Sequence, residues 1–584
     1  MRKTNSKQRL SLKALMVAVA TVCAAGTAQA FKIDAGEDWD VQLDNTVQWT
    51  TGWRMQSIKS KIGNQPFFNE GDYKFAKKGD MVTNRVQDLI EFQGTYQNKM
   101  GFRTSASIWH DFAYNDNVKQ NPAYVGVIPN SYAPVGSPVG TPGKYNNYVK
   151  HYFLEGGDWL DGFVFYNTQI FDKNVYAKVG RLAQYWGNAF FFGFSNIAYS
   201  QSPIDFGKVF TQPGSEIKEL FLPRNQVLFT ADITPDISIT GEYFLEYRHN
   251  IYPEAGTYFG FFDVLFQGPA TSGAFGALRN VGYKEPPNNN HNYGLKATWS
   301  PEWIGGDLGF YYRQLDEVDP WVGLGAGPGS EAGNWGSNFA QKTKLIGISF
   351  EKTFGSISTG WELNTRRHTA LNSSPFLTGD LKGASGNITN LIGNTLIQLG
   401  TASIGDFKLW NSGLLLAEFS YTHLNNVTDN PTLYSGKGTS NGAGGFVCTR
   451  NFDGVHPGDE KDGCSTKNSL AVAILFVPQW QQVWAGVDLE APISYTYGVH
   501  GNPAYRASAF FAEGTNIYSF GIRAIYQQKH QLTLSYNGNT WRSNGTAPGI
   551  PGTGVGPSYA GFGGAGAVGI NDRGWVELQY KTSF

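Results

Sequence analysis

The chain has 584 residues, of which only 16% are charged, while 72 are glycine and 15% are aromatic. Ordinary soluble domains carry about 25% charged residues, and neither collagen repeats nor simple low-complexity disorder fits this composition. After residue 30 no segment approaches the ~20 consecutive apolar residues of a membrane-spanning helix, so a helical inner-membrane protein is excluded as an interpretation.

Residues 1–30 read as a secretory signal peptide. Basic residues precede an apolar run at 14–25, and the segment ends on Ala28-Gln29-Ala30. Cleavage before Phe31 leaves residues 31–584 as one domain and removes five positive charges, so the mature chain carries a net charge of about −6. Because no basic stripe accompanies this charge, nucleic-acid binding is not expected.

Cys448 and Cys464 are the two cysteines of the mature chain. An even pair in an exported chain predicts a disulfide, here closing a loop rich in Gly and Asp. The metal alternative needs further ligands, and His456 is the only histidine between the two cysteines.

Period-two alternation predicts β-strands along the whole mature chain. In the first segment Trp39, Val41 and Leu43 share one phase, while Asp40 and Gln42 share the other. Similar runs are expected at 102–114, 176–182, 226–233, 237–247, 293–299, 307–315, 344–354, 356–368, 407–424, 471–477, 484–497, 517–526, 531–541 and 575–584.

Tight turns alternate with long segments rich in Gly, Asn and Pro. The turns include 232–237 and 527–530, and the long loops are expected at 115–147, 249–291, 316–341, 369–404, 425–467 and 542–571. This pattern is typical of an all-β transmembrane antiparallel β-barrel, with turns on the periplasmic side and long extracellular loops. We predict about 16 strands, within a range of 14–18; a secreted β-sandwich or propeller is the soluble alternative.

The last strand alternates up to Phe584. A terminal strand ending in Phe resembles the signal read by the outer-membrane assembly machinery. The predicted location is therefore the outer membrane, with its lipid as one partner.

A series of short motifs resembles a Gram-negative outer-membrane family catalogued as domain of unknown function 1302. The motifs are Gly180-Arg181, Trp186-Gly187, Ser202-Pro203-Ile204-Asp205, Pro213 to Glu219, Pro223 and Gly256-Thr257-Tyr258-Phe259. The resemblance implies a barrel that passes small hydrophobic compounds, alongside a periplasmic carrier and an efflux-type inner-membrane transporter.

The segment 186–224 contains Pro203, Pro213 and Pro223 and reads as a loop or short helix. We expect it to fold into the lumen as a plug, and the alternative is a solvated surface loop. The candidate lumen or plug residues are Arg181, Trp186, Asp205, Lys208, Glu216, Lys218, Glu219 and Arg224.

Two aromatic runs do not alternate, so a pleated lipid-facing wall does not explain them. The candidate path for an apolar ligand comprises Phe191, Phe192, Phe194, Tyr258, Phe259, Phe261 and Phe262. An interfacial aromatic girdle or the packed core of a folded loop remains an alternative.

Enzyme motifs occur only in the wrong context. Gly438-Thr439-Ser440-Asn441-Gly442 has nucleophile-elbow spacing but lies in a glycine-rich loop, and the glycine run at 561–566 lacks a βαβ unit. No cofactor or metal is predicted. The sequence thus predicts a non-enzymatic channel for small apolar compounds, with an open diffusion porin, an outer-membrane hydrolase and a structural or export-partner barrel as alternatives.

Overall fold

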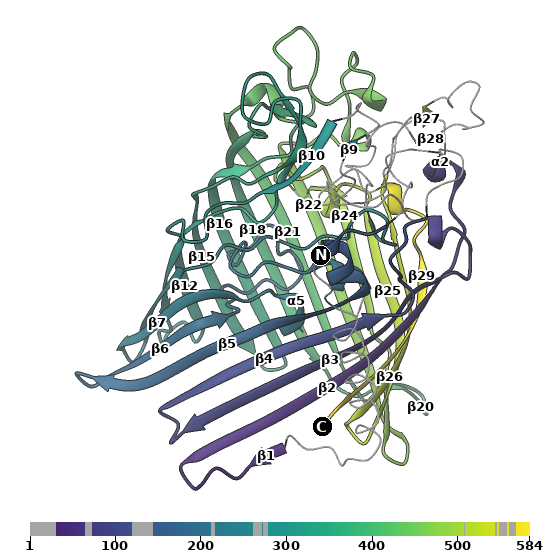
Figure 1. Ribbon diagram of the computed structural model, residues 1–584. Helices are drawn as coiled ribbons and strands as arrows, with labels where there is room; N and C mark the ends of the chain where they lie inside the picture. Colours follow the sequence, from purple (N-terminus) through teal and green to yellow (C-terminus); the bar gives the residue numbers. More distant parts are fainter. Residues whose placement is uncertain are drawn as a thin grey trace, which may run out of the picture.

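The computed structural model describes residues 31–64, 73–119, 144–211, 217–260, 271–272, 278–506, 508–542, 546–547, 558–559 and 568–584. Its main feature is a closed antiparallel β-barrel of 18 strands (Figure 1). The barrel strands are β2 (Trp39–Arg54), β3 (Met81–Tyr96), β4 (Met100–Asp111), β5 (Glu155–Ile170), β6 (Lys173–Leu182), β7 (Arg224–Thr234), β8 (Ile237–Phe244), β11 (Tyr293–Trp299), β12 (Asp307–Leu315), β15 (Thr343–Phe354), β16 (Ile357–Ala370), β18 (Ser385–Leu399), β21 (Ser412–Asp429), β22 (Asn468–Trp484), β23 (Val487–Glu490) with β24 (Ile493–His500), β25 (Asn516–Tyr526), β26 (His530–Thr540) and β29 (Trp575–Ser583).

β23 and β24 count as one barrel position, because both lie between β22 and β25. The barrel closes where β29 pairs with β2, and the backbone of Phe584 pairs with Asn45 through two 2.9 Å hydrogen bonds. Beyond that point β1 (Phe31–Ile33) continues the pairing along β2. β1 and β29 therefore pair with β2 along the same edge.

Side chains alternate between the lumen and the outer face along each strand. On β15, Thr343 and Ser349 are buried, whereas Ile346 and Ile348 are exposed. On β2 the inward phase holds the buried polar residues Gln48 and Arg54. This is the polar-in, apolar-out pattern on which the barrel prediction was based, and that prediction is confirmed.

The strand count is 18 rather than 16, although it lies within the predicted range. Three strands were missed: β3, β5 and β18. The expected loop at 369–404 is therefore wrong, since β18 occupies 385–399 and a turn-end hairpin follows it. The strands are too rich in Gly, Asn and charged residues to show clean apolar alternation.

The two ends of the barrel differ. At one, here called the turn end, short connections join β3 to β4, β5 to β6, β7 to β8, β15 to β16 and β25 to β26, as expected for 232–237 and 527–530. At the other, the loop end, long connections carry the remaining elements. These are α2 (Ser60–Gly63), η1 (Tyr73–Phe75), α3 (Asn147–Val149), η3 (Lys150–Leu154), α4 (Phe206–Thr211), α5 (Ile217–Leu220), β9 (Thr271–Ser272), β10 (Leu278–Lys284), β13 (Trp321–Ala326), β14 (Trp335–Asn338), β17 (Phe376–Thr378), η4 (Pro431–Leu433), η5 (Arg450–Phe452), η6 (Glu460–Asp462), η7 (Ser508–Phe511), β27 (Thr546–Ala547) and β28 (Ser558–Tyr559).

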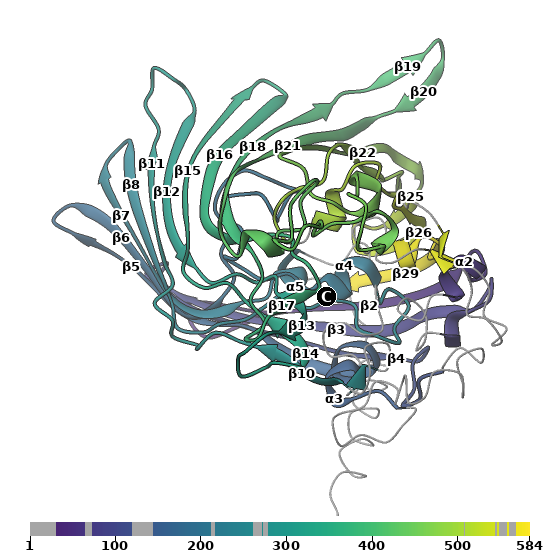
Figure 2. The ribbon, with the colours of Figure 1, turned by 90° about the horizontal axis from the view of Figure 1, so that it is seen from above.

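None of the helices in the described ranges is long and apolar enough to span a membrane. The connection between β6 and β7 carries α4 and α5 inside the ring of strands, as the view along the barrel shows (Figure 2). We call residues 183–211 and 217–223 the lumen segment.

Candidate functional site

Two glutamates of the barrel wall hold the start of the lumen segment. Glu418 on β21 accepts hydrogen bonds from the backbone N–H groups of Phe190, Phe191 and Phe192 at 2.6, 2.9 and 3.1 Å. The carboxylates of Glu418 and of the second glutamate, Glu362, are both buried, so water does not compete for their hydrogen bonds.

Glu362 on β16 does the same for the flanking residues. It accepts from the N–H groups of Asn188, of Ala189 at 2.9 Å and of Ile197 at 2.8 Å. Together the two wall carboxylates satisfy six backbone donors of an irregular segment that has no strand ladder of its own. Buried backbone donors need such partners, and here the wall supplies them.

The carbonyl groups of the same segment are satisfied by arginines and asparagines of the wall. Arg313 donates to Ile197 O at 2.9 Å and to Tyr199 O at 2.7 Å. The amide nitrogen of Asn364 on β16 donates to Ser195 O at 2.8 Å, and that of Asn394 on β18 donates to Asn188 O at 2.7 Å. The segment is thus fixed at both its donors and its acceptors.

The Trp186-Gly187 motif has a structural reason. Gly187 has φ +88°, and a Cβ there would lie 2.3 Å from an Oε1 atom of Glu362. The Trp186 ring is buried at 6.1 Å, centroid to centroid, from Tyr311. Only glycine combines the left-handed backbone with this close approach to the carboxylate.

Arg224, the first residue of β7, is buried and donates to the carbonyl groups of Ser200 and Gln201 at 2.6 and 2.8 Å. Arg181, at the end of β6, pairs with Glu246 at 3.0 Å. Of the predicted lumen charges, Arg224 therefore faces two backbone carbonyl groups and Arg181 faces a carboxylate.

The acidic and basic residues near α4 contact one another and β3–β4. Asp205 accepts from the backbone N–H of Lys208 at 2.9 Å, and burial raises the pKa of this carboxyl. The Lys208 ammonium lies 5.1 Å from the Trp109 ring centroid, and Glu219 accepts a hydrogen bond from Gln87. Glu216 and the side chain of Lys218 lie outside the described residues.

Aromatic residues of the predicted ligand path are packed against other rings. Phe194 stacks on Phe206 at 5.2 Å and on Phe510 at 5.4 Å, and Phe259 meets Trp575 edge-on at 5.8 Å. Phe192 and Tyr258 are equally buried, and Phe191 is half-buried. Phe261 and Phe262 lie outside the described residues, and a path along these rings stays a prediction.

A cavity of about 770 Å³ lies between the lumen segment and the wall strands β15, β16 and β18. Tyr185, Phe190 and Phe221 of the segment form much of its apolar lining, with Leu396 opposite. Asn188, Glu351 and Asn394 add polar groups to the lining. Strand ends lie nearby, since Glu351 and Ser358 flank the β15–β16 turn, which places the cavity toward the turn end.

Sequence reasoning missed the residues that define this site. Phe190 begins the aromatic run at 190–194 but was not among the predicted path residues, yet it is the ring of that run that lines the cavity, with 55% of its surface exposed. Glu362 and Glu418 were also missed, although each sits on the inward phase of an otherwise alternating strand. An isolated carboxylate on that phase is the signal that could have found them.

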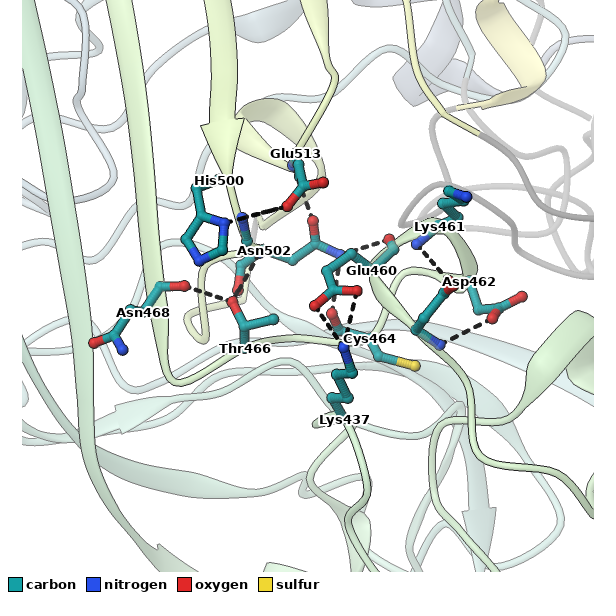
Figure 3. A network of polar contacts seen from close by, with 12 residues as sticks. Lys437, Glu460, Lys461, Asp462, Cys464, Thr466, Asn468, His500, Asn502 and Glu513 are labelled. Atoms are coloured by element: carbon teal, nitrogen blue, oxygen red, sulfur yellow. Dashed lines mark hydrogen bonds and ion pairs between the residues drawn. The ribbon is translucent and has the colours of Figure 1, made fainter.

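The disulfide prediction is confirmed, since Cys448 and Cys464 are joined. Their loop is held onto the β24–β25 connection by Asn502, whose amide nitrogen donates to Glu460 O at 2.8 Å and to Cys464 O at 2.9 Å (Figure 3). Lys437 adds an ion pair to the Glu460 carboxylate at 2.9 Å. These contacts tie the disulfide loop to a neighbouring connection at the loop end.

In the described ranges, no group of three or more His, Cys, Asp and Glu side chains is arranged to hold a metal ion. A comparison with protein families matches residues 11–584 to the family described as "Protein of unknown function (DUF1302)". The chain belongs to this family. The resemblance read from the motifs at 180–223 is thereby confirmed over nearly the whole chain.

No curated protein matches this family member. Among solved structures, it is similar to OccAB3 of Acinetobacter baumannii, with 8% identity, a TM-score of 0.39 and coverage of 93% of this chain and 99% of that one. It is also similar to the outer membrane protein opdK of Pseudomonas aeruginosa (10% identity, TM-score 0.37, 93% and 98% covered) and to the outer membrane channel DcaP of Acinetobacter baumannii (11%, 0.30, 95% and 100%).

Proposed function

We propose that this protein is an outer-membrane channel for small, mainly apolar molecules and performs no chemistry of its own. The observation that carries the proposal is the cavity of about 770 Å³ inside a closed barrel, lined by aromatic rings of the lumen segment. A mostly apolar cavity of this size with a few polar groups suits a small organic ligand.

The outer face of the barrel supports the membrane location. Large apolar side chains are exposed on the outward phase of strands on every side, among them Phe229, Leu295, Ile348 and Leu534. In water such a surface would be costly, whereas hydrocarbon accepts it, and a closed barrel leaves no unpaired strand edge in the lipid.

Exposed aromatic side chains mark the turn end. Phe171, Trp303, Phe354 and Trp484 each lie at or beside a connection there. Aromatic girdles at the two membrane interfaces are typical of outer-membrane barrels, whose short turns face the periplasm. We therefore place the cavity on the periplasmic side of the lumen and the disulfide loop outside the cell.

The lumen segment supports a ligand-selective path rather than an open pore. Its backbone is held by Glu362, Glu418, Arg313 and Asn364, so it occupies the lumen as an ordered unit. A ligand in the cavity would contact Phe190 and Tyr185 and could bond to Asn188 or Asn394. Exchange with a periplasmic carrier, and onward with an inner-membrane transporter, fits a cavity that faces the periplasm.

Two measurements test the proposal. In a planar bilayer, the folded protein is expected to show little conductance; stable steps of nanosiemens order would instead favour an open diffusion porin. Equilibrium dialysis of 1-naphthol against nanodiscs that contain the protein, with empty nanodiscs subtracted, is expected to show saturable binding. No saturable binding would contradict the apolar ligand class.

A matched pair of variants locates the binding. Phe190→Ser removes a cavity ring and is expected to weaken 1-naphthol binding about tenfold, because burying a phenyl ring contributes about 1.5–3 kcal/mol. Phe354→Ser removes an exposed ring at the β15–β16 turn and is expected to leave binding unchanged. Equal effects of the two substitutions would place the ligand elsewhere. Ester turnover abolished by a serine substitution would reveal the hydrolase alternative.

A further inference from the structure

The connection between β18 and β21 differs from the other turn-end connections. It forms a separate hairpin of β19 (Ala402–Ile404) and β20 (Phe407–Trp410), which reaches out beyond the outline of the barrel (Figure 2). Its tip residues Ile404 and Phe407 are 69% and 70% exposed. The lumen site does not use this element, so its apolar tip needs another explanation.

The strand register makes the hairpin two-faced. Ile404 lies opposite Phe407, and Ser403 lies opposite Lys408. The register shifts between Ala402 and Ser403, so that Ala402 lies opposite Trp410. Residues opposite each other share a face and successive residues alternate, so Ile404 and Phe407 lie on one face and Lys408 lies on the other. The register shift places one extra residue between Lys408 and Trp410, so Trp410, opposite Ala402, lies on the face of Ile404 and Phe407.

The apolar face of the hairpin continues the outer wall of the barrel. The Trp410 ring lies 5.5 Å from the ring of Phe476, centroid to centroid. Phe476 shares the outward phase of β22 with the exposed Ile474, whereas Ala471 and Ala473 are buried on the lumen phase. The hairpin and the lipid-facing wall therefore form one apolar surface.

We propose that this hairpin lies in the headgroup region of the periplasmic leaflet, with Ile404 and Phe407 in contact with acyl chains and Lys408 toward water. The inference rests on the membrane location proposed above. A periplasmic protein is the other candidate partner, but the continuity of Trp410 with Phe476 favours lipid, because the neighbouring wall already faces hydrocarbon. An amphipathic element at this depth holds the turn end at the membrane surface.

Single-cysteine labelling tests the inference on the full mature chain. The two native cysteines are joined in a disulfide, so an introduced thiol is the one available for labelling. Phe407→Cys is labelled with a polarity-sensitive nitrobenzoxadiazole dye, and the protein is folded into vesicles of phosphatidylethanolamine and phosphatidylglycerol, with and without brominated acyl chains. Lys408→Cys is the matched control on the opposite face of the hairpin.

Two further positions calibrate the result. Leu534→Cys reports the lipid-facing wall, and Ala332→Cys reports an exposed loop-end position. We expect brominated lipid to quench the dye at Phe407→Cys within about a factor of two of the quenching at Leu534→Cys, and clearly more than at Lys408→Cys.

Each other outcome has one meaning. Quenching at Phe407→Cys as weak as at Ala332→Cys, with Leu534→Cys still quenched, overturns the inference but leaves the membrane barrel intact. Weak quenching at Leu534→Cys as well contradicts the membrane location itself. A Phe407→Cys dye that brominated lipid does not reach, but that a periplasmic extract shields from iodide, indicates a protein partner and overturns the lipid assignment.

Discussion

The carboxylate of Glu418 on the barrel wall accepts a 2.9 Å hydrogen bond from the backbone N–H of Phe191 in the lumen segment, 227 residues earlier in the chain. The same carboxylate also accepts from the two neighbouring N–H groups. A strand that would otherwise only form the wall therefore determines where the segment sits. The position of the segment depends on a small number of inward-facing carboxylates.

Removing this carboxylate is expected to release the lumen segment. Glu418→Ala leaves three backbone N–H groups without their acceptor, and each one that water does not reach costs about 1–3 kcal/mol. We expect the variant to assemble, as judged by heat-modifiable migration, and to show larger and more frequent conductance steps in a planar bilayer than the parent protein.

Glu490→Ala is the matched control, because this wall glutamate on β23 pairs with Arg523 on β25 at 3.2 Å rather than with the described part of the lumen segment. It should conduct as the parent does. A Glu418→Ala protein that assembles and stays closed would show that the segment holds its place without the carboxylate.

Gly187 allows a second test of the same anchor. In Gly187→Ala the new Cβ would lie 2.3 Å from Glu362, so the segment or the carboxylate must move, and we expect a lower unfolding temperature and increased conductance. Gly438→Ala controls for backbone strain alone, since Gly438 has φ +72° and no neighbouring atom within 4 Å of the added Cβ. Equal losses in both variants would mean that strain, not the clash, is responsible.

The barrel could be predicted from the sequence because lipid imposes a simple rule on most strands. The rule is that polar side chains face the lumen and apolar side chains face the lipid. On β2, for example, the inward Gln48 and Arg54 alternate with outward apolar residues. The rule fails for β18, where Gly386, Asn390 and Asn394 resemble a loop. Of these residues, Asn394 donates to Asn188 O of the lumen segment, whereas Asn390 bonds to Asn364 and Thr422 of the neighbouring strands. The sequence alone does not reveal these partners.

The site was less predictable than the wall. The prolines and charges of 186–224 indicated an irregular segment, but its partners lie on strands far along the chain. Asn394 contacts Asn188 across 206 residues, a pairing that no local pattern encodes. The aromatic run at 190–194 was noticed as unusual, yet sequence alone does not tell that Phe194 packs into a core while Phe190 lines a cavity.

A buried carboxyl in the β12–β15 connection predicts a pH dependence of stability. Burial raises the pKa of Asp319 to about 6, although Tyr199, Tyr252 and Asn250 donate hydrogen bonds to it. Between about pH 4 and 6 the folded protein therefore retains a proton that the unfolded chain has lost, so this group's contribution to stability is largest at low pH and is lost as pH rises through that window.

Asp319→Asn is expected to flatten this dependence. A difference of about 2 between the folded and unfolded pKa corresponds to about 3 kcal/mol, so the parent should lose more thermal stability than the variant between pH 4 and pH 7. The measurement is the midpoint of the heat-modifiable transition in detergent. Asp406→Asn, on the exposed β19–β20 hairpin, should follow the parent. Parallel curves for the Asp319→Asn and parent proteins would contradict the assignment.

The disulfide and Asn502 are expected to act on the same loop. The bond spans 16 residues, for which the loss of loop entropy in the unfolded chain corresponds to about 3 kcal/mol. Asn502 is fully buried and donates hydrogen bonds to the carbonyl groups of Glu460 and Cys464. Asn502→Ala therefore removes the two bonds that dock the loop and leaves the disulfide intact. Both Asn502→Ala and the Cys448→Ser/Cys464→Ser double variant should migrate as folded barrels yet be cleaved faster by protease at residues 430–467. Because the two changes weaken the same docked loop, the combined variant should be cleaved more slowly than the sum of the two separate effects predicts. Additive effects on the cleavage rate would show that the disulfide and Asn502 stabilise the loop independently.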